Sequence, residues 1–448
     1  MRPKPLISKI PLFQVPLERL VDEKHPLVKL ADLIAWPIFD ERFGGLYTDD
    51  AQGGHPPLPT RLMVGLHYLK YTFNVSDEQV VAQWIENPYW QYFCGMTEFR
   101  HELPCDPSSL SRWRKRIGAE AMKALLEETW KTALRGKFAT AAQAQEVVVD
   151  TTVQEKAVAF PTDARLLNKA REVVVRAAER SGMVLNQTYK RIGKRLLIRY
   201  GRYMHAKQFK RAKRVLKRLR TILGRVLRDV GRKVIEMNAV LAIWVARAQR
   251  IFEQKRHDKN KLYSLHAPEV SCIAKGKAKV RYEFGAKVGI TTTAKGNWAI
   301  GVATFAGNPF DGATLRESLT QAELVTGKPV KRALVDQGYR GKTHHPEGVN
   351  VVVVGRKQKN LSRCERRQRG RRASIEPVIG HLKSDHRMQR NFLKGSAGDS
   401  INAVLAACGF NLRKLLRAFF LWLFSWFFEF KPGREDKNHP LLLLETTA

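Results

Sequence analysis

Three acidic residues, Asp150, Asp336 and Glu376, have types and positions suited to joint metal binding. Each aspartate closes an apolar, β-branched segment, and the glutamate opens a helical one. Carboxylate oxygens are the ligands that Mg²⁺ prefers, and two such ions roughly 3.5 to 4 Å apart can activate a water or a 3′-hydroxyl and stabilise the leaving oxygen at phosphorus. The three acids therefore predict metal-dependent phosphoryl transfer, provided that the fold brings them together.

Glu376 lies within a strongly basic stretch, residues 369–390. Pro377 cannot sit deep inside a helix, so the sequence predicts a helix that begins near Ser374 with Pro377 in its first turn. Lys383 follows Glu376 by two helical turns, and both should project from one face. One interpretation makes Glu376 a metal ligand and Lys383 a phosphate contact. The alternative is a glutamate that complements the helix dipole and a solvated lysine.

The elements around the two aspartates indicate a sheet covered by helices. The run 146–152 reads as a buried strand that ends at Asp150, and the run 330–336 as a strand that ends at Asp336. The other expected elements are a hairpin over 282–305, a helix over 311–326 and a strand over 349–354. This order can place two acids at neighbouring strand ends and the third on a helix above the sheet. Asp150 could instead cap a loop.

Residues from about 163 to 262 depart from this pattern and read as long amphipathic helices. One apolar stripe contains Val215, Leu216, Leu219, Ile222, Leu223, Val226, Leu227 and Val230, and the basic residues around it include Arg214, Lys217, Arg218, Arg220, Arg225 and Arg228. We therefore expect a basic helical insertion within a catalytic domain of residues 141–395. Its basic face could follow a phosphate backbone, contact a partner protomer, or simply be solvated.

Residues 1–140 show helical periodicity without strand-like alternation. The segment 76–79 has the form of a capping box, and 87–95 reads as a turn with an aromatic patch. In a following short helix, Leu110, Trp113 and Ile117 should face inward, and the remaining surface carries Arg112, Arg114, Lys115 and Arg116. These features suit a helix-turn-helix-like DNA-binding region, with those four cations as DNA contacts. A solvated basic face is the alternative.

The charge balance indicates a polyanionic partner. The chain has 79 Lys and Arg against 42 Asp and Glu, a formal net charge of +37. Nucleic acid is the expected partner, because Lys and Arg contacts to phosphates release counterions. A membrane surface is the competing partner, but the apolar run 418–428 is shorter than the roughly 20 residues that span a bilayer. We interpret that run as part of a C-terminal helix and tail over 396–448, and expect no membrane partner.

Other motifs add little to this interpretation. The five cysteines are scattered without a C-x-x-C pair, and no G-x-x-x-x-G-K-[ST] loop is present. The N-terminus lacks the apolar region of a signal peptide, so the cytoplasm, in association with the nucleoid, is the expected location. The pair His344 and His345, and His381 with Asp385, are weaker candidates for a transition metal.

Taken together, these residues resemble the DDE transposases of bacterial insertion sequences, in particular the IS-five-like group. The resemblance rests on residues 59–61, 74–77, 84–89 and 108–115, on Val-Val-Asp150-Thr-Thr with 160–163, on 282–288, and on Asp336-Gln-Gly-Tyr-Arg-Gly followed by 376–388. The family pattern Tyr-x2-Arg-x3-Glu-x6-Lys is matched at Arg372, Glu376 and Lys383. Arg369 stands where the tyrosine is expected.

The resemblance implies an RNase H-like, mixed-sheet α/β catalytic domain, preceded by an all-helical DNA-binding region. It implies that Asp150, Asp336 and Glu376 form the catalytic triad and hold Mg²⁺, for which Mn²⁺ can substitute, with Arg372 and Lys383 on phosphates. The implied partner is double-stranded DNA, both the terminal inverted repeats and the target, bound by a homodimer or higher homo-oligomer. A related nuclease or integrase and a non-catalytic DNA-binding protein remain alternatives.

Overall fold

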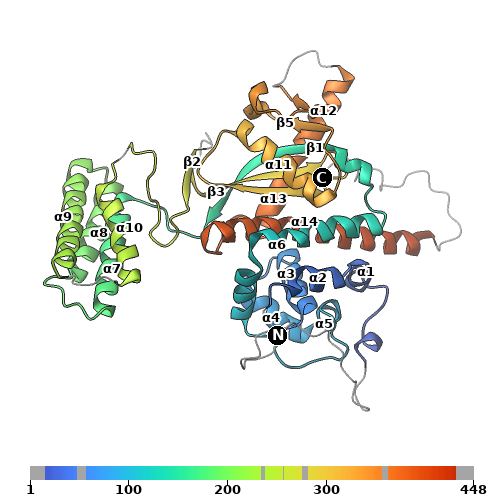
Figure 1. Cartoon of the computed structure of the whole chain (residues 1–448), viewed down its shortest axis with the longest axis horizontal. Coiled ribbons are helices and arrows are strands. Elements are labelled where there is room, and N and C mark those ends of the chain that lie inside the picture. The colour runs from blue at the N-terminus through green and yellow to red at the C-terminus, as the bar shows by residue number, and fades with distance from the viewer. Residues whose placement is uncertain are drawn as a thin grey trace. The chain divides into compact units, whose positions relative to one another are not determined.

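The computed structural model describes residues 16–47, 57–233, 238–255, 257–274, 281–355 and 362–429, except for the side chains of Lys342 and of residues 421–429. The chain is a mixed α/β protein that divides into two compact units, one of residues 1–155 and 287–448 and one of residues 156–286 (Figure 1). Each unit is described by itself.

The first unit begins with helices, as the periodicity predicted. They are η1 (Leu17–Arg19), α1 (Pro26–Leu33), α2 (Pro37–Gly44), α3 (Thr60–Thr72), α4 (Asp77–Glu86), α5 (Pro88–Phe93) and α6 (Pro107–Arg135). The capping box is confirmed: the Ser76 hydroxyl accepts from the Gln79 amide at 3.1 Å, and the Gln79 side chain accepts from the Ser76 amide at 2.9 Å. The predicted turn over 87–95 is wrong, because Asn87 caps the short helix α5 by accepting from the Trp90 amide.

Helix α6 is longer than the sequence pattern indicated. Leu110, Trp113 and Ile117 are buried, as predicted. The helical geometry breaks at Gly118, whose φ of +75° is readily accessible to glycine, and the helix then resumes to Arg135.

The sheet follows these helices in the first unit, after η2 (Ala141–Gln145). Its strands are β1 (Glu146–Lys156), β3 (Tyr282–Thr293), β4 (Ala299–Phe305), β5 (Arg332–Val335), β6 (Asn350–Val353) and β7 (Arg390–Asn391). They are ordered β4-β3-β1-β5-β6, with β7 paired to β1. The predicted hairpin is confirmed as the antiparallel pair β3 and β4, and the β1–β5 and β5–β6 pairs are parallel. The predicted helix over 311–326 is α11 (Asp311–Thr326).

Helices after the sheet complete this unit: α12 (Arg363–Ala373), α13 (Ile375–Ser384) and α14 (Gly395–Glu429), with η3 (Gln337–Tyr339) and η4 (Lys342–His344) between β5 and β6. Helix α13 begins directly after Ser374 and has Pro377 in its first turn, as predicted. Most of the predicted apolar run 418–428 lies outside the described side chains. No helix in the described part of the chain is long and apolar enough to cross a membrane.

Helix α14 joins the N-terminal helices to the sheet. The Asn411 side chain accepts from the Ala299 amide at 3.0 Å, donates to the Ala299 carbonyl at 2.8 Å, and donates to the Thr129 hydroxyl on α6 at 3.0 Å. Figure 1 shows α14 running beside α6 between the sheet and the N-terminal helices. One hydrophobic core therefore extends from the N-terminal helices into the sheet.

The second unit contains the helices α7 (Asp163–Arg180), α8 (Lys190–His205), α9 (Phe209–Lys233) and α10 (Ala239–Glu253), and the strand β2 (Ser271–Ala274) paired with the start of β3. These helices enclose a core of their own. The predicted apolar stripe of α9 is confirmed: Val215, Leu219, Ile222, Leu223, Val226, Leu227 and Val230 are buried, and Leu216 is partly buried against them.

Candidate active site

The parallel pairing of β1 and β5 brings two of the predicted acids to the same level of the sheet. Glu146 lies opposite Arg332 and Val148 opposite Leu334, so the same register places Asp150 level with Asp336. Asp336 follows the last residue of β5, as predicted. Asp150 does not end its strand, because β1 continues to Lys156. The third acid, Glu376, stands in the first turn of α13.

All three acids converge on one guanidinium group, that of Arg372. Its Nη2 lies 3.1 Å from Asp150 Oδ2 and 3.6 Å from Asp336 Oδ2, and its Nη1 lies 2.5 Å from Glu376 Oε1. Arg372 is largely buried at 17% side-chain exposure, whereas Glu376 is 63% exposed. The carboxylates thus share one cationic position that is open to solvent on the side of Glu376.

Local hydrogen bonds turn the aspartates toward this position. Asp150 Oδ1 accepts from the Thr151 amide at 2.7 Å, and Asp336 Oδ1 accepts from the Gly338 amide at 2.9 Å. In both residues the other oxygen, Oδ2, faces Arg372. A cavity of about 400 Å³ opens beside this cluster, and its lining includes Asp336, Arg372, Glu376 and Arg369, the residue that replaces the family's tyrosine.

A fourth carboxylate, Asp311 at the start of α11, lies beside the cluster and was not predicted. Its Oδ1 accepts from the Thr151 hydroxyl at 2.7 Å and lies 2.5 Å from Lys287 Nζ. A Cβ atom on Gly338 would stand 2.9 Å from Asp311 Oδ2 and 3.0 Å from Asp336 Oδ1, so this close approach requires glycine. Asp311 therefore contacts the segment after Asp150 and approaches the turn after Asp336.

One signal could have revealed this fourth acid. Lys287 is 7% exposed within the otherwise apolar middle of β3, and a buried lysine needs an acidic partner. An aspartate at the start of a predicted helix is usually assigned to the helix dipole, and this habit conceals a partner that is distant in sequence.

Tyr339, which follows Asp336 in η3, is fully buried next to the acids. Burial raises the pKa of its hydroxyl well above the ordinary value, and the charges of Asp150 and Asp311 raise that pKa further. The Tyr339 hydroxyl is therefore neutral at physiological pH.

Lys383 lies half-buried in the last turn of α13, two turns from Glu376 as predicted. The residues that line the 400 Å³ cavity do not include it. The weaker metal candidates remain incomplete: His381 Nδ1 lies 2.9 Å from Asp385 Oδ2, and His345 Nε2 lies 3.0 Å from the Tyr339 carbonyl oxygen. Across the described ranges, no group of three or more His, Cys, Asp or Glu is arranged as a metal site, since Arg372 lies among the acids.

The four cations predicted to contact DNA differ in their surroundings. Arg112, Lys115 and Arg116 are exposed, and the guanidinium of Arg116 lies over the Tyr47 ring at 5.0 Å. Arg114 is buried at 3% exposure, and its two Nη atoms donate to the Asp77 carboxylate at 3.0 and 2.6 Å. The expected DNA contact is therefore withdrawn for Arg114, because its charge is already used inside the helical region.

Asp77 also binds the buried Lys70, whose Nζ lies 2.8 Å from Asp77 Oδ1. Burial disfavours the ionised carboxyl, but the hydrogen bonds from Arg114 and the charge of Lys70 outweigh it and hold the Asp77 pKa well below its usual value. Burial lowers the Lys70 pKa to about 8, with Asp77 opposing the change. This network connects α3, α4 and α6.

Comparison with known proteins agrees with the site. Residues 15–116 match the family described as "Transposase domain (DUF772)", and residues 336–416, which contain Asp336, Arg372 and Glu376, match the family described as "Transposase DDE domain". The chain belongs to the DDE transposases. Asp150 lies outside both matched ranges, so its place in the site rests on the geometry at Arg372.

A relative of this transposase is the "Uncharacterized protein ORF8 in nfe locus" of Rhizobium meliloti. It is 48% identical over 210 residues, which cover 47% of this chain and all of the relative. No solved structure matches the chain significantly.

Proposed function

We propose that this protein is a transposase of the IS-five-like group that binds the terminal inverted repeats of its insertion sequence and catalyses metal-dependent DNA cleavage and strand transfer. The observation that carries the proposal is the convergence of Asp150, Asp336 and Glu376 on the Arg372 guanidinium. A parallel β1–β5–β6 group beside an antiparallel β3–β4 hairpin supports an RNase H-like assignment, with Asp336 directly after β5 and Asp150 level with it on β1.

The donor set fits Mg²⁺ or Mn²⁺, because oxygens of all three carboxylates already surround one positive charge. Bound there, divalent ions would activate the attacking hydroxyl and stabilise the leaving oxygen. Arg372 would then exchange its contacts with the acids for a non-bridging oxygen of the scissile phosphate. Arg369 on the cavity wall and Lys383 on α13 would contact neighbouring phosphates.

Two successive displacements at phosphorus follow. In the first, a water oxygen bonds to phosphorus as the bond to the 3′-oxygen breaks, which frees a 3′-hydroxyl at the element end. In the second, that hydroxyl bonds to a target phosphorus and displaces another 3′-oxygen. The backbone amides that donate to Asp150 and Asp336 hold these two carboxylates in orientation during both steps.

Recognition of the terminal repeats is assigned to the N-terminal helical region, with Arg112, Lys115 and Arg116 as its exposed cations. A homodimer or higher homo-oligomer would hold two ends together, on DNA in the nucleoid. The test is to incubate the protein with its flanking DNA and Mg²⁺ and to analyse nicked and joined products. Joined products are expected, whereas cleavage without joining would indicate a nuclease, and sequence-specific binding without cleavage a DNA-binding protein.

A further inference from the structure

Helix α9 of the second unit carries a row of cations along one face. Lys210, Lys213, Arg214 and Lys217 are spaced i, i+3, i+4 and i+7, the spacing of neighbours on a helical surface. All four are exposed. We call these four residues the α9 row.

The α9 row differs from two other cations of the same helix. Lys233 pairs with Asp229 at 3.3 Å, and Arg220 donates to the Phe252 and Gln254 carbonyl oxygens at 2.8 and 3.0 Å. Within the described residues, the row has no carboxylate at ion-pair distance and no hydrogen-bond acceptor for its side chains. The described residues of this unit therefore do not balance its positive charge.

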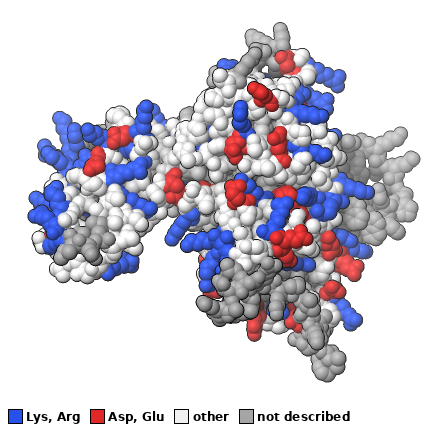
Figure 2. Space-filling view, viewed as in Figure 1, with Lys and Arg blue, Asp and Glu red and all other residues white. Residues whose placement is uncertain are grey.

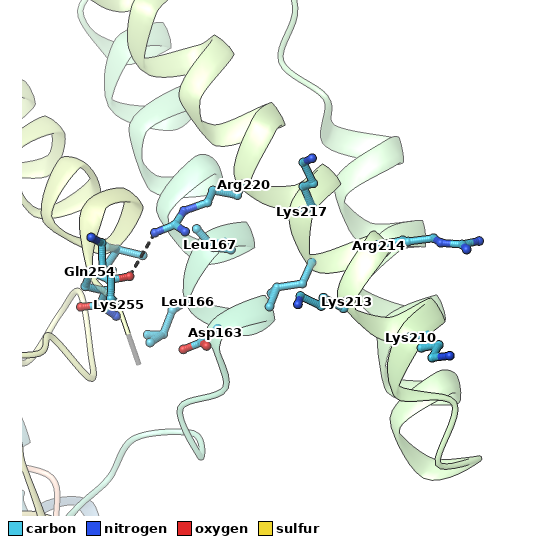
Figure 3. A pocket seen from close by; sticks show the side chains of 12 residues that line it. Asp163, Leu166, Leu167, Lys210, Lys213, Arg214, Lys217, Arg220, Gln254 and Lys255 are labelled. Atoms are coloured by element: carbon cyan, nitrogen blue, oxygen red, sulfur yellow. Dashed lines mark hydrogen bonds between the residues drawn. The ribbon is translucent and has the colours of Figure 1, made fainter. Parts of the chain in front are cut away.

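The row borders a cavity of about 680 Å³. The cavity is lined by the four cations, by Arg220 and Lys255, by the apolar Leu166, Leu167, Leu216 and Ile251, and by Gln254 and Asp163. Figure 3 shows Arg220 reaching from α9 toward Gln254, whose carbonyl oxygen accepts from Arg220 Nη2 at 3.0 Å. Asp163 is the single acid of the lining, and Lys261 Nζ lies 4.0 Å from it. The result is an apolar floor with a cationic rim.

We propose that the α9 row and its cavity bind the sugar-phosphate backbone of a DNA strand, at a site apart from the catalytic acids and from the N-terminal helical region. The proposal rests on the function proposed above, and it adds a surface for contact without sequence readout. At 1.5 Å per residue, the row extends roughly 10 Å along α9, the length over which one DNA strand presents about three phosphates. The apolar floor suits the deoxyribose faces between those phosphates.

Charge favours DNA over a second copy of this chain. The chain carries a formal net charge of +37, so a second copy would be repelled by this rim. Figure 2 shows Lys and Arg spread over the visible face of the second unit, with few Asp or Glu among them. A polyanion with evenly spaced charges fits this surface better than a second copy does.

The test compares two full-length variants with equal charge loss. One replaces the α9 row with glutamine (Lys210→Gln, Lys213→Gln, Arg214→Gln and Lys217→Gln), and the control replaces four exposed cations of α8 (Arg191→Gln, Lys194→Gln, Arg195→Gln and Arg199→Gln). Glutamine is a good helix former, and circular dichroism checks that both variants keep their helices. Affinity for a random-sequence duplex is measured by fluorescence anisotropy between 50 and 300 mM salt.

We expect the α9 variant to bind at least tenfold more weakly at 100 mM salt, with a salt slope shallower by about 3, because each lost phosphate contact removes nearly one released counterion. The α8 control should lose less than threefold. Equal losses in both variants would overturn the site in favour of bulk charge. An unchanged affinity of the α9 variant for the duplex would also overturn it, and loss of binding to a polyglutamate peptide alone would assign the cavity to an acidic protein.

A separate readout keeps this result apart from the proposed function. Wild-type protein that binds the duplex through the α9 row but neither cuts nor joins element ends would contradict the transposition chemistry and retain the inference. If the wild-type protein transposes while the α9 variant binds the duplex normally, the transposition chemistry is supported and the inference about the α9 row is contradicted.

Discussion

The cations around the three predicted acids and the cations of the α9 row are used in opposite ways. Arg372 contacts all three acids, Arg371 Nη1 lies 2.6 Å from Glu146 Oε2, and Lys287 Nζ lies 2.5 Å from Asp311 Oδ1. The α9 row has no such partner among the described residues. Cations that are paired inside the fold fix the positions of carboxylates. Cations left unpaired on a surface are available to an external polyanion. The paired cations are therefore suited to organising the predicted active site, and the unpaired ones to binding DNA.

The largest effect should come from the acids themselves. Asp150→Ala, Asp336→Ala and Glu376→Ala should each lower single-turnover cleavage of element ends by roughly 10³-fold or more, because the site loses a metal ligand. Binding to those ends should change by less than threefold, since phosphate contacts supply the affinity. Cleavage by any one variant at the wild-type rate would remove that acid from the site.

Substitution of Arg372 should have the second-largest effect on cleavage. Arg372→Ala removes the cation that aligns the acids and then the phosphate, so we expect single-turnover cleavage to fall roughly 10²-fold at saturating protein. The exposed Arg366 on the same helix offers a matched control, and Arg366→Ala should leave the rate unchanged. Comparable rates in the two variants would mean that Arg372 takes no part in cleavage and only pairs with the acids in the fold.

Asp311 should have a smaller effect that appears in the metal dependence. Asp311→Asn weakens the ion pair with Lys287 and loosens the segment that carries Asp150, so we expect roughly tenfold slower cleavage and a higher Mg²⁺ concentration for half-maximal rate. The exposed Glu317 on α11 provides the control Glu317→Gln. If Asp311→Asn lowers thermal stability without changing the Mg²⁺ dependence, Asp311 is structural only.

The smallest effect should come from His67, a buried histidine that contacts the paired cation Arg114. His67 Nε2 lies 3.2 Å from Arg114 Nη1, and burial, followed by the Arg114 charge, lowers the His67 pKa to about 3. The unfolded chain binds a proton on this histidine below about pH 6.5, whereas the folded protein does so only near pH 3, so stability falls as pH drops through that window. The free energy of unfolding should lose on the order of 2 kcal/mol by pH 5.

The measurement for this prediction is urea unfolding at pH 7.5 and pH 5. His67→Gln should show a smaller decrease between the two pH values than the wild type, and substitution of the exposed His101 by glutamine should leave the decrease unchanged. His386, whose pKa burial lowers to about 4, should act in the same direction as His67. An equal decrease in wild type and His67→Gln would contradict the role of the buried imidazole.

The sequence predicted the elements whose periodicity is strong and local. The hairpin over 282–305, the helix over 311–326 and the start of α13 after Ser374 follow from alternation, amphipathicity and proline geometry. Strand ends were less certain: the apolar run stops near Asp150, but pairing carries β1 on to Lys156. Tertiary hydrogen bonds decide that boundary, and periodicity does not report them.

The site itself was predicted only in part, for a related reason. Residue types and order indicated three acids, but the partner of a cation depends on which elements pack together. Arg114 reads as one more exposed cation until α4 brings Asp77 to it, and Asp311 reads as a helix cap until β3 brings Lys287 to it. Buried ion pairs between distant segments leave little trace in local sequence pattern.

The central claim is that Asp150, Asp336 and Glu376 form one metal site, and binding of Mn²⁺ to the protein without DNA tests it most directly. Electron paramagnetic resonance counts bound Mn²⁺ for the wild type and for Asp150→Asn, Asp336→Asn and Glu376→Gln. We predict that the wild type holds Mn²⁺ and that each variant binds it at least tenfold more weakly, because every acid supplies oxygens to the same position. Equal Mn²⁺ binding by the wild type and all three variants would contradict the account.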